Sequence, residues 1–140
     1  MTNKYIKTEK VDISIHPEGF CIIKFRSGSY LNPNDIYELG ELNDQILDLA
    51  RELGRTDCLV DGLIPFVVVD IREVMGMSKG AREAATRVNR DTEAGGVAVV
   101  SNSAMGRMIG NFFINFNRPK FPIRMFQDEE EAFAWLRSLK

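Results

Sequence analysis

Three ionisable side chains, Asp70, Arg72 and Glu73, directly follow the apolar run FVVV of residues 66–69. A nearly unbroken apolar run of this kind is typical of a strand buried on both faces, inside a sheet that helices cover. Open α/β sheets bind ligands beyond the carboxyl ends of such strands. The group therefore has two interpretations. It is either a site for a ligand or partner, or, more commonly for such residues, a set of loop ion pairs and backbone caps.

Ser78 opens a segment, from about Met77 to Thr92, whose apolar spacing predicts a helix. As an N-cap, its hydroxyl would accept a hydrogen bond from the first turn, which is worth about 1 kcal/mol. A phosphate on Ser78 would instead be stabilised by the helix N-terminus and by the nearby cations Lys79 and Arg82. Capping is the commoner use of serine at such a position.

A third helix is predicted after Ser103, and its apolar residues cover more than one buried stripe. Two interpretations stay open. The apolar set is either all core, or part of it lines a pocket for an apolar ligand or a subunit contact. The residues concerned are Met105, Met108, Phe112 and Phe116.

The residue types needed for most site chemistry are scarce. His16 is the one histidine, and its position before Pro17 indicates a surface turn. Cys21 and Cys58 have no metal-ligand spacing, and Cys21 lies in an apolar strand as a small core residue. No Gly-x4-Gly-Lys-Ser/Thr loop and no Gly-x-Ser-x-Gly elbow occurs. The sequence therefore predicts no catalytic residues, no metal and no cofactor.

Composition narrows the class of protein further. The chain has 140 residues, 44% of them hydrophobic and 27% charged, which suits one globular domain with residues 1–10 flexible. The net charge of −2 gives no overall field that favours nucleic acid. No apolar run approaches the ~20 residues of a membrane helix. The first residues, MTNKYIKTEK, lack the apolar stretch of a signal peptide, so a cytoplasmic location is expected.

The predicted elements follow in the order strand, strand, helix, and then strand and helix three times over. The segment VDISIHPEGFCIIKF predicts a hairpin with its turn at Pro17 to Gly19. The loop RSGSYLNPND leads to one helix from Pro33 to Leu53, which Gly54 ends. The later elements are the strand before Asp70, the helix of Ser78, the strand VAVV, the helix after Ser103, the strand FPIRMF and a last helix capped by Asp128. This order predicts an α/β fold, with a mixed sheet of an N-terminal hairpin plus parallel strands, covered by about four helices.

The C-terminal segment RPKFPIRMFQDEEEAFAWLRSLK combines several features. A basic residue and a proline precede a short strand that ends in Phe. An acidic cap follows, and then Ala132, Trp135 and Leu136 in the spacing Ala-x-x-Trp-Leu. VVVDIRE before a serine-initiated helix, and MGRMIGNFF, add to the pattern. On these motifs the chain resembles small bacterial SpoIIAA-like proteins of the STAS (sulfate transporter and anti-sigma factor antagonist) fold group.

The resemblance implies a STAS-like fold from about residue 11 to the end. In the anti-sigma antagonist branch, a kinase partner phosphorylates a serine that lies just after the strand ending in Asp. The matching position here is Ser78, eight residues after Asp70.

Three functions remain open. The first is a non-enzymatic regulatory module that binds a protein partner or itself through Asp70, Arg72, Ser78, Lys79 and Arg82. The second is a carrier of a lipid or other apolar small molecule at the third helix. The third is an enzyme with a site near Asp70 and Ser78.

Overall fold

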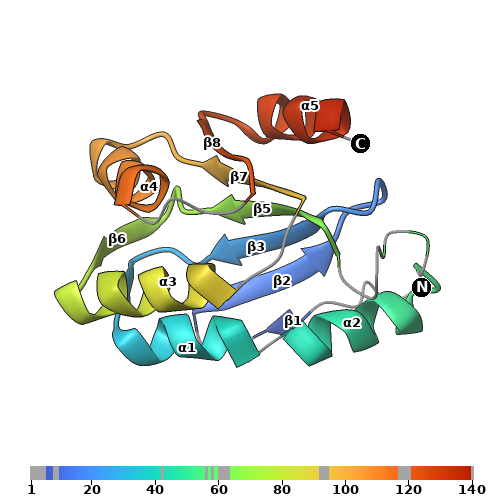
Figure 1. Cartoon of the computed structure of the whole chain (residues 1–140), viewed down its shortest axis with the longest axis horizontal. Helices are drawn as coiled ribbons and strands as arrows, with labels where there is room; N and C mark the ends of the chain where they lie inside the picture. The colour runs from blue at the N-terminus through green and yellow to red at the C-terminus, as the bar shows by residue number, and fades with distance from the viewer. Residues whose placement is uncertain are drawn as a thin grey trace.

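The fold is a central sheet with helices on both faces (Figure 1). The computed structural model describes residues 6–7, 10–41, 43–55, 57, 59, 64–91, 95–116 and 121–139. The central sheet has the strand order β1-β2-β3-β5-β7-β8. Its strands are β1 (Ile6–Lys7), β2 (Val11–Ile15), β3 (Cys21–Phe25), β5 (Phe66–Asp70), β7 (Gly96–Val100) and β8 (Ile123–Phe126).

The first strands pair antiparallel and the later ones parallel, as the sequence predicts. β2 pairs antiparallel with both β1 and β3, while β3, β5, β7 and β8 run parallel to one another. The hairpin turns at Gly19, whose φ of 92° suits glycine, and the Gly19 amide donates to the His16 carbonyl. β5 lies between β3 and β7, and Val68 is completely buried. The prediction of an interior strand before Asp70 is therefore confirmed.

Five helices are described in these parts of the chain. They are α1 (Pro33–Glu41), α2 (Asn43–Glu52), α3 (Lys79–Asp91), α4 (Ala104–Phe116) and α5 (Glu129–Leu139). The segment predicted as one helix from Pro33 is described as α1 and α2, on either side of residue 42. Gly54, with φ 67°, ends α2 as predicted. Its amide donates to the Arg51 carbonyl, and the Arg55 amide donates to the Ala50 carbonyl. None of the helices in the described ranges is long and apolar enough to cross a membrane.

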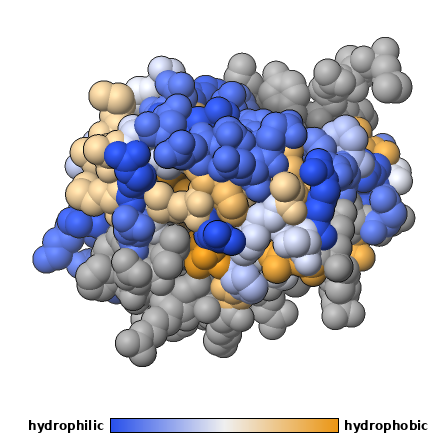
Figure 2. Space-filling view, turned by 90° about the horizontal axis from the view of Figure 1, so that it is seen from above, coloured by the Kyte–Doolittle hydropathy of each residue, from blue (hydrophilic) through white to orange (hydrophobic). Residues whose placement is uncertain are grey.

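One face of the sheet is covered by α5. Ala132, Phe133 and Leu136 of this helix pack on a buried cluster that includes Phe20 and Val68. Seen from this side, the outer surface of the molecule carries many hydrophilic residues (Figure 2). The apolar spacing of α5 therefore serves to attach the C-terminal helix to the sheet.

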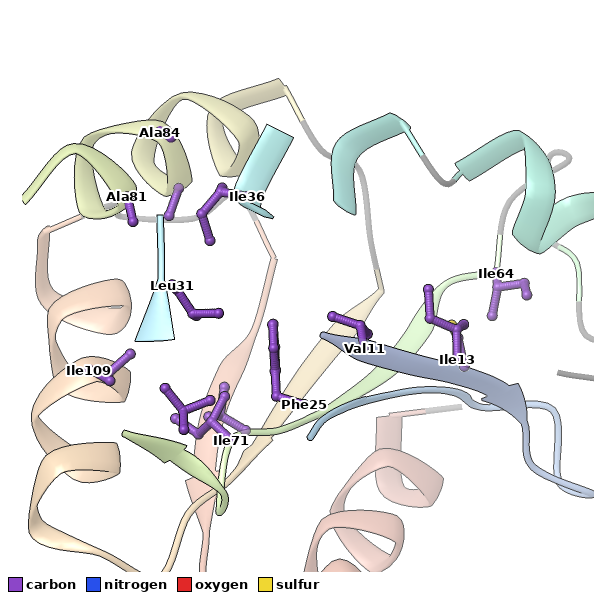
Figure 3. Close-up of a cluster of buried hydrophobic side chains, with 14 of the residues drawn as sticks. Val11, Ile13, Phe25, Leu31, Ile36, Ile64, Ile71, Ala81, Ala84 and Ile109 are labelled. Atoms are coloured by element: carbon purple, nitrogen blue, oxygen red, sulfur yellow. The ribbon is translucent and has the colours of Figure 1, made fainter. Parts of the chain in front are cut away.

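The other face carries the larger core. Ile36 of α1, Ala81 and Ala84 of α3 and Ile109 of α4 point toward sheet residues that include Phe25 (Figure 3). Small side chains on α3 let that helix approach closely, as its alanines predict. Cys21 is buried in this cluster, which confirms its interpretation as a core residue.

A second sheet of two parallel strands, β4 (Ser29–Leu31) and β6 (Val74–Met77), corrects the sequence prediction. The first segment was expected to be a loop, and the second to be the connection between the strand ending at Asp70 and a helix from about Met77. Each is short and pairs with a partner more than 40 residues away, and the register shifts between Ser29 and Tyr30. Gly76 lies against the Tyr30 ring, where a Cβ atom would come within 3.1 Å of a ring carbon. Local periodicity gives little signal for such a pair.

Candidate functional site

The carboxyl ends of β5, β7 and β8 meet at one edge of the central sheet. The Ile71 amide donates to the Val100 carbonyl at 3.0 Å, and the Ser101 amide donates to the Phe126 carbonyl at 2.9 Å. The residues that follow these three strands therefore form one continuous edge. Asp70 and Ser101 are both 1% exposed there and are the buried polar residues of the described chain.

Asp70 is held by Arg72, two residues later. The Arg72 backbone amide donates to Asp70 Oδ1 at 3.0 Å, and its Nη2 donates to Oδ2 at 2.7 Å. Nε also donates to both carboxylate oxygens, at 3.1 and 3.2 Å. This side-chain hydrogen bonding to Asp70 raises the pKa of Arg72, against an opposing effect of burial. The buried carboxylate is thus paired and hydrogen-bonded, as a buried charge must be.

Arg72 also joins this edge to the start of α5. Its Nη2 donates to Glu129 Oε1 at 2.9 Å across 57 residues of sequence. The charges of Glu129 and the exposed Glu73 raise the pKa of Arg72 further, after that of Asp70. We call this Asp70–Arg72–Glu129 arrangement the arginine bridge. Its geometry suits a structural ion pair that connects the end of β5 to the start of α5. This agrees with the interpretation of Asp70 and Arg72 as an ion pair.

Two other polar side chains at this edge cap helices, while the hydroxyl of the buried Ser101 donates to the Ser103 carbonyl at 3.5 Å. Ser103 Oγ accepts from the Gly106 amide at 3.0 Å at the start of α4. Asp128 Oδ1 accepts from the Glu131 amide at 2.8 Å at the start of α5, as predicted. Within the described residues, no group of three or more His, Cys, Asp or Glu side chains could hold a metal ion.

Ser78 lies apart from the arginine bridge. The four residues of β6 separate the two, which corresponds to roughly 13 Å of extended chain. Ser78 Oγ accepts from the Ala81 amide at 3.0 Å, so the hydroxyl points into its own first turn and the capping prediction is confirmed. Lys79 and Arg82 are exposed beside it. The predicted polar residues therefore form two groups, Asp70 with Arg72 and Ser78 with Lys79 and Arg82.

We expect Ser78→Ala to lower the free energy of unfolding by about 1 kcal/mol, because the Ala81 amide loses its acceptor. Ser78→Asp keeps an acceptor and should stay close to the wild type. Urea unfolding of both variants measures the difference, with the exposed Lys79→Ala as a control. Equal losses in the alanine and aspartate variants would contradict the capping role.

The methionines of α4 lie outside the core. Met105 is 41% exposed and Met108 is 58% exposed, whereas Ile109, the residue after Met108, is buried. The interpretation of the whole apolar set as core is therefore wrong for these two residues. The side chains of Phe112 and Phe116 lie outside the described part of the structure.

Met75 of β6 is an apolar surface residue that the sequence did not indicate. It is 66% exposed and lies where the β4–β6 register shifts, a setting that redirects side chains. β6 packs beside α4, so Met75 belongs to the same end of the molecule as Met105 and Met108 (Figure 1). A methionine flanked by Val74 and Gly76 gives no sequence signal for this exposure.

His16 is less exposed than a simple turn residue. Its ring stacks on Phe20 at a centroid distance of 5.8 Å and lies 4.4 Å from the Phe133 ring. Its Nδ1 accepts from the Glu18 amide at 3.1 Å. These contacts give His16 a packing role between the hairpin turn and α5.

Comparison with solved structures places this fold among known ones. An uncharacterised protein of the DUF3478 family from Shewanella loihica PV-4, described as having a SpoIIAA-like fold, matches with a TM-score of 0.62 and 17% identity. The match covers 97% of this chain and 98% of that one. The anti-sigma factor antagonist SpoIIAA in its unphosphorylated form matches with a TM-score of 0.46 and 12% identity, over 91% of this chain and 97% of that one. The expected SpoIIAA-like fold is confirmed by the first match.

The comparison with curated proteins finds no match. A family model described as "Domain of unknown function (DUF7793)" matches residues 59–140, which include β5, the arginine bridge, Ser78 and the exposed methionines of β6 and α4. The chain therefore belongs to this DUF7793 family.

Proposed function

We propose that the chain is a non-enzymatic regulatory module that acts by binding a protein partner. The observation that carries the proposal is the exposure of Met75, Met105 and Met108 on two neighbouring elements. Exposed apolar side chains that gather on one part of a surface are typical of binding sites. Methionine in particular suits surfaces that adapt to a partner, because its side chain is flexible and polarizable.

The polar residues support a binding role over a catalytic one. Asp70 is bound by Arg72, while Ser78 and Ser103 cap helices, so these side chains already serve the fold. Lys79 and Arg82 present positive charge beside the start of α3. In this proposal the start of α3 is a second contact for the partner, and phosphorylation of Ser78 would alter that contact by adding negative charge.

The partner can be isolated by cross-linking a tagged chain in its source cells, and its affinity then measured with both purified proteins. We expect Met108→Asp to weaken the complex by about tenfold or more, because it places a charge in an apolar contact. Lys79→Glu with Arg82→Glu should also weaken it. Arg51→Glu on α2, whose side chain is exposed and pairs with Asp48 of the same helix, is the charge-reversal control.

Two results would overturn the proposal. A native mass spectrum of the purified chain that shows a bound small molecule, without any protein complex, would indicate a carrier of an apolar molecule. Saturable turnover that is lost in an Arg72 variant of preserved fold would indicate an enzyme.

A further inference from the structure

The first step concerns the apolar surface made by Met75, Met105 and Met108, which we call the methionine face. On α4 the exposed positions Ala104 and Met108 lie on the side away from the buried Ile109 and Gly110. Met105, about 40° around the axis from Ile109, lies at the border of that exposed side. Among the described positions of α4, Arg107 is the charged one. Helical geometry puts it about 200° around the axis from Met105, on the far flank of the exposed side.

The second step concerns the charge beside this face. Glu73, Asp128, Glu129 and Glu130 follow the carboxyl ends of β5 and β8, and we call them the acidic rim. The arginine bridge connects the part of the rim after β5 to the part after β8. Arg72 donates a hydrogen bond to Glu129, and the charge of Glu73 raises the pKa of Arg72. Arg72 is balanced by the buried Asp70, so the rim keeps a net negative charge.

The third step places the two surfaces side by side. Glu73 is two residues before Met75. Met105 lies in the first turn of α4, directly after the edge residues 101–103, which lie between the ends of β5 and β8. In Figure 2, hydrophilic atoms border the hydrophobic atoms at the left of the molecule, on the side where α4 lies. An apolar face with negative charge along its border is complementary to a segment that is apolar on one side and basic at its margin.

We infer that the methionine face binds a basic amphipathic segment of a partner protein, with leucine-like side chains on the methionines and lysine or arginine on the acidic rim. This inference rests on the proposed function and names the chemistry of the partner. An anionic membrane surface fits less well, because the rim would repel its headgroups. A second copy of the chain also fits less well, because a two-fold contact uses the same patch twice and would bring two acidic rims together.

The test uses the full chain labelled with carbon-13 at the methionine ε-methyl groups. The probe is a synthetic peptide of about four helical turns with leucine on one face and lysine on the other. Saturable shifts of the Met75, Met105 and Met108 methyl signals are expected, with little change at Met77 and Met125, which are partly buried. A peptide with glutamate in place of every lysine should bind at least about tenfold more weakly.

Two sets of variants assign the contacts. Met108→Ser should weaken binding of the lysine peptide by about tenfold, because it removes a methyl thioether that the bound peptide would cover. Glu73→Gln with Glu130→Gln should weaken it by about three- to fivefold and reduce its dependence on salt. All of these side chains are exposed, so the thermal stability should stay close to that of the wild type.

Several outcomes would overturn the inference. Equal binding of the glutamate peptide would contradict the basic character that we assign to the partner segment. Shifts confined to Met77 and Met125 would show that the peptide binds away from the methionine face. Shifts that anionic vesicles alone produce would assign the face to a membrane, and shifts that depend on protein concentration alone would assign it to a second copy. A natural partner that responds to Lys79 and Arg82 variants but not to Met108→Asp would overturn this inference while the proposed function stands.

Discussion

Arg72→Met is expected to lower the free energy of unfolding by about 3 kcal/mol, because it leaves the buried Asp70 carboxylate without its charged partner. Breaking a buried pair on one side costs about 3–5 kcal/mol, and the lower end applies because the Arg72 side chain is 27% exposed. Chemical unfolding followed by circular dichroism measures the loss. The raised pKa keeps Arg72 charged well above neutral pH, so its contribution is present throughout the neutral range and is lost only as strong alkali removes the proton.

Two further variants separate the arms of the arginine bridge. Glu129→Gln removes a carboxylate that is 37% exposed, so we expect a loss of about 0–1 kcal/mol. Asp70→Asn combined with Arg72→Met removes both charges, and it should be more stable than Arg72→Met alone. An Arg72→Met variant within about 1 kcal/mol of the wild type would contradict the structural role of the bridge. That result would return Arg72 to the candidates for direct contact with a ligand.

The elements with strong local patterns could be predicted from the sequence. The run FVVV predicted an interior strand, and β5 indeed lies between two parallel neighbours. The caps at Ser78 and Asp128 were also predicted, because a short polar side chain before an apolar spacing has few other local uses. In each of these cases the physical cause lies within a few residues of sequence.

The features that the sequence did not predict, or left open between two interpretations, depend on distant contacts. β4 and β6 acquire strand structure by pairing with each other, and neither carries an alternating pattern. The exposure of Met105 and Met108 depends on which side of α4 the sheet covers. Because apolar residues extend around much of that helix, the sequence could not predict which side this would be. Glu129 could be predicted at the start of a helix, but its contact with Arg72 spans 57 residues.

These distant contacts also shape the proposed binding surface. The methionine face combines an exposed strand residue with residues of the next helix but one, and the arginine bridge fixes the acidic rim beside it. The position of the rim therefore depends on α5 staying attached to the sheet. Two ring pairs contribute to that attachment, Phe20 with Phe133 and Phe126 with Trp135.

Phe20→Ala is expected to lower the free energy of unfolding by about 3–5 kcal/mol, the cost of deleting a large buried ring. Phe20 is completely buried, and its ring stacks on Phe133 of α5 at 5.7 Å between centroids. The cavity would open between the end of the hairpin and α5, where the Phe20 ring contacts the rings of His16 and Phe133. Amide hydrogen exchange in α5 should then become faster relative to exchange in α3, which packs on the opposite face.

His16→Ala is the matched control, since it removes a ring from the same stack at its partly exposed edge. We expect a loss of about 1 kcal/mol for this variant, because the imidazole is smaller and more polar than a phenyl ring and 24% of the His16 side chain stays exposed. If Phe20→Ala and His16→Ala cost the same, or if exchange in α3 and α5 rises equally, the stack does not hold α5 in place. In that case the other contacts of α5, which include the buried Ala132 and Leu136, hold the helix on the sheet.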